Sequence, residues 1–284
     1  LLAVLAPPDV EPSIQSAPLA FRPAVRDASY VARMTDNVLQ VVAHLAKLRS
    51  ESGRVVTLAL EPEPYCYLES TDETIRYFEE ELRSPSGVAR LAELAGVGED
   101  AAAEALQRHL GVVFDIGHQA VGFEDAAASL RKLRDAKVPI FKLQEAAALS
   151  VPEVTSEVVR ELERFAHSIY LTQTTELSEG SRRQYLNLED AIESWTNAPR
   201  TAEWRVHFHV PVFLDELGPF RTTRFAIEDA LALHRASPLS THLEIETYTW
   251  DVLPAHLKGG DIVEYVSREL DWVISTLEAP EPVA

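Results

Sequence analysis

Short runs rich in apolar and β-branched residues alternate along the chain with stretches whose apolar residues recur at helical spacing. This alternation is typical of parallel βαβ units, because parallel strands need a long crossover, usually a helix, between them. The strands that we expect are 13–20, 55–62, 111–116, 139–144, 204–213 and 242–247, with 169–173 as a candidate seventh. The helices that we expect are 36–49, 71–82, 87–94, 99–109, 124–135, 152–167, 188–195, 227–235 and 260–276.

The length and composition fit one domain that covers residues 1–284. Hydrophobic residues make up 46% of the chain and charged residues 25%, which is enough apolar material for a sizeable core. No repeat, low-complexity tract or Gly/Ser-rich linker divides the sequence. We therefore expect a single folded domain.

The net charge and the single cysteine indicate which binding partners and which cellular compartment to expect. With 26 lysines and arginines against 45 acidic residues, the net charge of −19 repels nucleic-acid phosphates and anionic membranes. The apolar opening 1–6 is far shorter than the roughly 20 residues that span a bilayer, and no basic residue precedes it. Cys66 has no second cysteine for a disulfide. We expect a cytoplasmic protein with no nucleic-acid partner and no transmembrane segment.

The expected strands carry polar residues on one face. In the strand 204–213, His207 and His209 share a face with Arg205, opposite three apolar side chains. Because helices separate the strands, we expect the apolar faces to pack on helices and the polar faces to line the interior of a barrel. The pattern therefore predicts an α/β fold of the TIM (β/α)8-barrel type.

Polar residues also stand at the carboxyl ends of the expected strands, where a barrel of this type carries its active site. A cluster of buried acids is costly unless a cation lies among them. Oxygen ligands with one or two imidazoles suit Mn²⁺, Mg²⁺, Co²⁺ or Zn²⁺, and the sequence does not choose among these ions. The residues that we expect to bind this divalent metal are Glu61, Asp115, Gln144, His209 and Glu246.

The segment Phe114–His118 places an acid and an imidazole close together. Asp115 ends a strand, and His118 follows three residues later, after a glycine that lets the chain turn. We expect both side chains at the same mouth of the barrel. Taken alone, the Asp-x-x-His spacing is a weak pattern, so it gains weight from the other residues at the strand ends.

Five longer strings carry a resemblance to a known family. They are EPEPYCYLES, FDIGHQAVGFED, FKLQEAAAL, WRVHFHVPVF and HLEIETYTWDVLP. These strings resemble the xylose isomerase-like TIM barrels, the superfamily of the sugar phosphate isomerases and epimerases, and more narrowly the bacterial metabolite-traffic proteins called EboE. The resemblance extends from about Pro12 to Leu253.

The resemblance implies a metal site with three departures from the family pattern. It implies ligation by Glu61, Asp115, Gln144 and Glu246, with His118 oriented toward the substrate. Gln144 stands where epimerases usually carry a histidine, for which His209 is a substitute, and the arginine that usually follows is missing. Six or seven strands are visible where the barrel has eight, so we expect its first one or two βα units to be missing from this chain.

Each of these residues also has a plain structural interpretation. The alternative for Glu61 is a helix-capping or surface acid, and the alternative for Asp115 is a carboxylate that caps the next loop. A loop histidine such as His118 often only bonds the backbone. His209 has a buried interior histidine as its alternative. Trp250, which we expect to stack on a substrate together with contacts from His118 and His207, is otherwise a core aromatic.

Two functions from different classes follow. The first is metal-dependent isomerisation or epimerisation of a small hydroxy-carbonyl metabolite, with Glu61 and Glu246 exchanging a proton at the carbon between them. The second is a metabolite-binding or traffic protein that keeps the metal pocket without turnover and works with proteins of the same pathway. A barrel endonuclease is disfavoured by the net charge of −19. The oligomeric state stays open.

Overall fold

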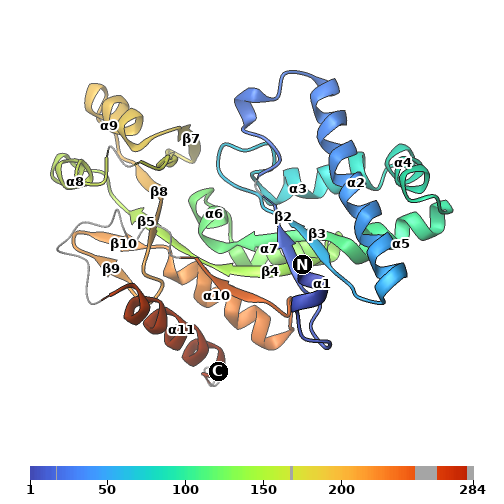
Figure 1. The fold of residues 1–284 in the computed structure, drawn as a ribbon. Helices are drawn as coiled ribbons and strands as arrows, with labels where there is room; N and C mark the ends of the chain where they lie inside the picture. The colour runs from blue at the N-terminus through green and yellow to red at the C-terminus, as the bar shows by residue number, and fades with distance from the viewer. Residues whose placement is uncertain (17, 167–168, 247–260, 280–284) are drawn as a thin grey trace. The chain divides into compact units, whose positions relative to one another are not determined.

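The computed structural model describes residues 1–16, 18–166, 169–246 and 261–279 (Figure 1). Its Cα positions group into two compact units. The first unit contains Leu1–Phe114, Ser129–Leu143 and Ser240–His242, and the second contains Asp115–Ala128, Gln144–Leu239 and Leu243–Ala284. The prediction of one domain over residues 1–284 stays a prediction.

One sheet of the structure is built from strands that lie far apart in the sequence. Parallel pairing joins β1 (Ser13–Gln15) to β2 (Thr57–Leu60), with Ser13 opposite Thr57. It also joins β2 to β3 (Leu110–Asp115), with Leu58 opposite Leu110. Every residue of β2 and β3 is buried, as expected for strands of a parallel sheet covered on both faces. The order is β1 (Ser13–Gln15), β2 (Thr57–Leu60), β3 (Leu110–Asp115), β4 (Ile140–Glu145) and β11 (Leu243–Ile245).

Helices of the first unit begin and end at residues with clear capping chemistry. Asp27 accepts a hydrogen bond at the start of α2, which ends at the left-handed Gly53, and Ser70 and Glu73 form a capping box on α3. In Figure 1, α2 lies beside α4 and α5, which it contacts. The helices of this unit are α1 (Leu2–Leu5), a 3₁₀ turn (Arg22–Ala24), α2 (Ala28–Ser52), α3 (Thr71–Tyr77), a π-helical turn (Phe78–Leu82), α4 (Pro85–Ala95), α5 (Glu99–His109) and, from Ser129 on, α7 (Ala126–Asp135).

The second unit contains an antiparallel sheet that the periodicity does not predict. Its order is β7 (Ser181–Tyr185), β6 (Thr174–Ser178), β8 (Glu203–Val210), β5 (Ala147–Val151), β10 (Phe220–Thr222) and β9 (Glu216–Leu217). Within this unit, α10 contacts both α6 and α11. The helices here are α6 (Ile116–Val121), α8 (Ser156–Leu162), α9 (Leu188–Asn197), α10 (Arg224–Ala236) and α11 (Ile262–Glu278). Among the described residues, no helix combines the length and the apolar character needed to cross a membrane.

The predicted TIM (β/α)8 barrel is therefore wrong. The described strands form a five-stranded sheet and a six-stranded antiparallel sheet, and they show no clear eightfold repeat of strand and helix. The strand predicted at 204–213 is β8, which pairs antiparallel with β5 and β6. The candidate strand at 169–173 is also misplaced, because β6 begins at Thr174. Because there is no such barrel, the expectation that its first one or two βα units are missing is wrong as well.

Two short connections explain the antiparallel sheet. Only Ala146 separates β4 from β5, which is far too short for the crossover that a parallel return requires, so β5 joins an antiparallel sheet instead. Glu179 and Gly180 join β6 to β7, with φ angles of 51° and 75°. Positive φ at both central residues is the geometry of the type I′ hairpin turn, which a glycine favours.

A buried ion pair connects three strands of this antiparallel sheet. Glu176 on β6 is 2% exposed and accepts hydrogen bonds from Arg200 at 2.8 and 2.7 Å. The indole nitrogen of Trp204 on β8 also donates to Glu176, at 2.9 Å, and Arg200 donates to the hydroxyl of Tyr185 on β7. The carboxylate is thus fully bonded inside the unit, which is the condition for a buried charge to be tolerated.

We predict that Arg200→Ala lowers the free energy of unfolding by about 3 kcal/mol. The change leaves Glu176 buried without its cation, and the value lies at the low end for a broken buried ion pair because Arg200 is 21% exposed. Urea unfolding measures the difference. Arg160→Ala, at an exposed position of α8 in the same unit, is the control and is expected to change stability by less than about 0.5 kcal/mol. Equal effects of the two variants would contradict the assigned role of the pair.

Candidate metal centre

The short helix α6 begins at Asp115 and carries His118 in its first turn. Asp115 Oδ1 accepts a hydrogen bond from the backbone nitrogen of His118 at 2.9 Å, which caps the helix. A Cβ atom on Gly117 would lie 3.1 Å from the carbonyl oxygen of Ala146 and 3.2 Å from Asp115 Oδ1. A side chain there would push these neighbours away by a few tenths of an ångström, so a glycine favours the close packing of α6.

Gln144 joins two carboxylates. Its Nε2 atom donates to Asp115 Oδ2 at 2.8 Å and to Glu246 Oε2 at 2.6 Å. Asp115 is fully buried and Gln144 is 1% exposed, whereas the Glu246 side chain keeps 34% of its surface exposed. These three residues stand at the end of β3, near the end of β4 and just after β11, so strand ends bring them together as the sequence predicts.

Three imidazole rings pack beside these carboxylates. The ring centroids of His118 and His207 are 4.6 Å apart in an edge-to-face arrangement, and those of His207 and His209 are 5.3 Å apart. All three side chains are buried, with exposures of 5% or less. His118 Nε2 also lies 3.5 Å from Asp115 Oδ2, and His209 Nδ1 lies 3.7 Å from Glu246 Oε2. The imidazoles and carboxylates thus form one cluster inside the second unit.

Hydrogen bonds orient two of the imidazoles. His207 Nδ1 lies 3.0 Å from Gln173 Oε1, and His209 Nδ1 lies 3.2 Å from the backbone oxygen of Glu246. A carbonyl oxygen can only accept, so Nδ1 of each ring carries the hydrogen and Nε2 carries the lone pair. Sequence reasoning missed Gln173, and its only signal is its place in the polar run Thr172–Thr175.

The protein environment keeps the rings of His207 and His209 uncharged at neutral pH. Burial, together with the neighbouring rings of His118 and His209, lowers the pKa of His207 well below its usual value. Burial and His118 lower the pKa of His209 to about 3, while the hydrogen bond to the Glu246 backbone acts in the opposite direction. A neutral imidazole is the form that binds a metal ion.

The cluster contains two sets of residues suited to a metal ion. One ring nitrogen or carboxylate oxygen from each of Asp115, His209 and Glu246 lies within 4.8 Å of the others, and so does one nitrogen from each of His118, His207 and His209. Of the predicted site residues, the structure thus brings six together in the second unit: Asp115, His118, Gln144, His207, His209 and Glu246.

Two predicted site residues, Glu61 and Trp250, do not belong to the described part of the second unit. Glu61 follows β2 in the first unit, where Gln15 Nε2 donates to its carboxylate at 2.7 Å and Lys142 donates to Gln15 Oε1 at 3.3 Å. Its roles as metal ligand and as catalytic partner of Glu246 stay predictions. Trp250 lies outside the described residues, so its predicted contact with substrate also stays a prediction.

Two arginines that sequence reasoning did not place in the site bind the carboxyl end of α6. Arg205 donates to the backbone oxygen of Ala120 at 2.7 Å and stacks on the ring of Phe123, 4.0 Å from its centroid. Arg182 donates to the backbone oxygens of Gly122 and Phe123, each at 2.8 Å. Cations at a helix carboxyl end complement its dipole, so both arginines hold the helix that carries His118.

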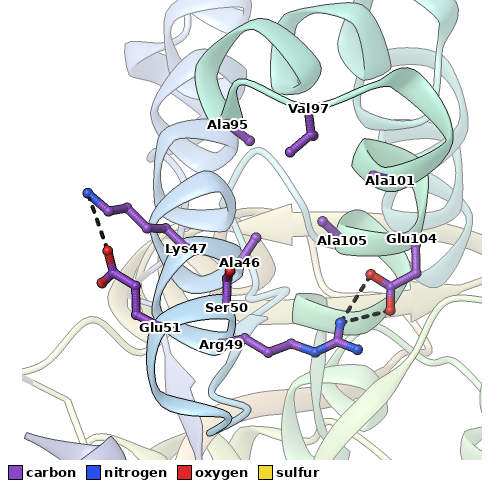
Figure 2. Close-up of a pocket in the computed structure, with 10 residues that line it drawn as sticks. All are labelled: Ala46, Lys47, Arg49, Ser50, Glu51, Ala95, Val97, Ala101, Glu104 and Ala105. Carbon is purple, nitrogen blue, oxygen red and sulfur yellow. Dashed lines mark hydrogen bonds and ion pairs between the residues drawn. The ribbon is translucent and has the colours of Figure 1, made fainter.

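A hollow in the first unit contains none of the predicted site residues. Its volume is about 490 Å³. Figure 2 shows the lining side chains on α2, on α5 and around the end of α4. Alanine methyls and Val97 form much of the wall, and the exposed ion pair Arg49–Glu104 lies at its edge.

Glu145 is a second residue that sequence reasoning missed. It ends β4, is fully buried, and neither carboxylate oxygen has a hydrogen-bond partner among the described residues. Burial, followed by the nearby charge of Asp115, raises the pKa of Glu145 to about 8. The side chain is therefore a neutral carboxylic acid at neutral pH.

We predict that Glu145 makes the protein less stable as the pH rises. The unfolded carboxyl ionises near 4.5 and the folded one near 8, so the unfolded state has released a proton that the folded state still holds. The free energy of unfolding then falls between about pH 4.5 and pH 8. Glu145→Gln removes this contribution, so its melting temperature should rise relative to the wild type over that interval.

Thermal unfolding with a chelator across this pH range measures the effect. Glu157→Gln, an exposed acid on α8 in the same unit, is the control and should follow the wild-type profile. Parallel profiles for the wild type and Glu145→Gln would show that the carboxyl is ionised in the folded protein.

Comparison with known proteins adds no assignment to this geometry. Neither a protein-family model nor a curated protein matches the chain. The resemblance of strings such as FDIGHQAVGFED to the xylose isomerase-like and EboE families therefore stays a prediction.

Proposed function

We propose that this chain is a metal-dependent isomerase or epimerase that acts on a small hydroxy-carbonyl metabolite. The observation that carries the proposal is the meeting of Asp115, Gln144, His209 and Glu246 in one cluster. Among the described residues, the buried Asp115 carboxylate contacts backbone, amide and imidazole groups and has no lysine or arginine partner. A bound cation supplies the compensating charge that such a carboxylate lacks.

The residues present fit a divalent cation. Asp115 and Glu246 offer carboxylate oxygens, and His209 offers an imidazole nitrogen. Gln144 faces both carboxylates with its amide nitrogen, and rotation of the amide would present its oxygen instead, since the two ends have nearly the same shape. This donor set suits Mn²⁺, Mg²⁺, Co²⁺ or Zn²⁺, as proposed from the sequence.

A divalent ion, when bound, polarises carbonyl and hydroxyl oxygens of a substrate. The protein supplies the proton transfer. Glu246 is the cluster carboxylate with exposed surface, so it is the group placed to take a proton from a substrate carbon and return it at a carboxylate oxygen. His118, packed against Asp115, orients the substrate. Glu61 is named as the second acid of the exchange from the sequence alone.

One observation favours a second candidate, a metabolite-binding protein of the EboE type without turnover. The amide of Gln144 already donates to both carboxylates, so it satisfies them without a cation. A protein that only holds its ligand needs no charged catalyst in this place. The two candidates differ in metal content and in turnover.

We predict that the double variant Asp115→Asn/Glu246→Gln loses its Mn²⁺. The change removes two anionic ligands, while asparagine still caps α6, so the fold is retained. Elemental mass spectrometry after incubation with Mn²⁺ and desalting is expected to give near-stoichiometric metal in the wild type and little in the variant. A panel of ketoses and aldoses then tests for turnover.

The control removes the same charge from exposed positions of the same unit. Asp125→Asn/Glu228→Gln is expected to keep both the metal and any turnover, because Asp125 is an exposed acid that caps the next helix and Glu228 is an exposed acid that pairs with Arg224. A wild type that binds Mn²⁺ but turns over no substrate on the panel would contradict the proposed isomerase or epimerase function and favour the metabolite-binding function. If the wild-type protein retains no Mn²⁺ after desalting, the proposed metal site is wrong.

A further inference from the structure

The three histidines of the cluster form a donor set that the proposed isomerase does not use. That function needs His209 beside the carboxylates and assigns His118 and His207 to the substrate. Yet one nitrogen from each of the three rings lies within 4.8 Å of the other two, and each side chain is at least 95% buried. Three buried imidazoles from α6 and β8 thus converge on one small volume.

The hydrogen bonds already described select the atom that each ring of β8 presents. Gln173 Oε1 and the Glu246 backbone oxygen accept from the Nδ1 atoms of His207 and His209, so the Nε2 atoms are the lone-pair donors. Bonding of the second ring nitrogen to a carbonyl oxygen is the usual support of a metal-binding histidine. The cluster therefore has both the ligand atoms and the groups that orient them.

The alternative role, a purely structural packing of rings, accounts less well for this arrangement. Buried aromatic rings in a core are usually apolar, whereas three imidazoles bring polar nitrogens into a volume without water. Their mutual repulsion also prevents all three from being protonated there. His109 shows the structural pattern for comparison: it is a single buried imidazole in the first unit, bonded through Nδ1 to the Val56 oxygen. The histidines of α6 and β8 form a group of three.

We propose that His118, His207 and His209 bind one Zn²⁺ or Co²⁺ ion through three imidazole nitrogens. Three protein ligands are the usual number in a catalytic zinc site, and imidazole suits Zn²⁺ and Co²⁺, whereas Mg²⁺ and Mn²⁺ favour carboxylate and amide oxygens. His209 belongs to both sets, so the metal's own ligand preference decides between them. The proposal makes His207 a ligand and is independent of isomerase turnover.

The decisive variant is His207→Gln, because His207 belongs to the imidazole set alone. Metal-stripped protein is titrated with Zn²⁺ in competition with a chromophoric chelator, and with Co²⁺ while its visible absorption is recorded. We expect the wild type to bind one Zn²⁺ per chain and the variant to bind it more than about 100-fold more weakly, beyond the loss typical of a supporting residue. The Co²⁺ absorption should be lost in parallel.

Glu246→Gln and His109→Gln are the matched controls. Glu246→Gln changes only the carboxylate and keeps the backbone oxygen that orients His209, so it should keep Zn²⁺ and weaken Mn²⁺. His109→Gln makes the same chemical change as the decisive variant in the other unit and should leave both metals unaffected. Circular dichroism and thermal unfolding of each variant report whether it is folded.

A pair of substitutions at Gln173 tests the orienting hydrogen bond without touching a ligand. Gln173→Leu removes the acceptor for His207 Nδ1 and is expected to weaken Zn²⁺ binding by about 10- to 100-fold. Gln173→Glu restores an acceptor and should recover the affinity. This pair keeps the proposal testable even if His207→Gln does not fold.

The outcomes separate this proposal from the proposed function. Unchanged Zn²⁺ affinity and Co²⁺ absorption in His207→Gln, or in both Gln173 variants, would overturn the imidazole site. Loss of Zn²⁺ in His207→Gln with no Mn²⁺ binding in the wild type would uphold the imidazole site and reject the carboxylate site. Loss of Zn²⁺ in Glu246→Gln but not in His207→Gln would reject the imidazole site and uphold the carboxylate site.

Discussion

The carboxylate of Asp115 is the group on which the cluster depends. One oxygen caps α6, and the other accepts from Gln144 and faces His118, so a single fully buried side chain sets the start of a helix and the position of two neighbours. A helix of six residues is too short to be stable alone. Its cap at one end and Arg205 at the other hold His118 in place.

The strand-end residues were predictable because the rule behind them is local. Alternation of faces and the end of an apolar run identify Asp115, Gln144 and Glu246, and these three are joined by hydrogen bonds in the structure. The start of the helix predicted from residue 71 was equally predictable, because the capping box of Ser70 and Glu73 lies within four residues. Where a feature depends on neighbours in sequence, the sequence predicts it.

The sheets were not predictable in the same way, because pairing depends on residues far apart. No local pattern in 204–213 distinguishes a strand of a parallel barrel from a strand of an antiparallel sheet. The residues that pair with β8 lie on β5 and β6, between 26 (Leu177 with Glu203) and 63 (Ala147 with Val210) positions away in the sequence. The same holds for the partners of the histidines. Gln173 stands 34 residues before His207, and no periodic pattern connects the two.

The bridge made by Gln144 has a consequence for the cost of binding. Two carboxylates repel each other, and a site that must first gather them loses part of its binding free energy to that work. Here an uncharged amide holds Asp115 and Glu246 together through its two N–H groups. A cation that replaces the amide meets ligands already in place, so the cluster is preorganised, and a side-chain rotation is the step that opens it.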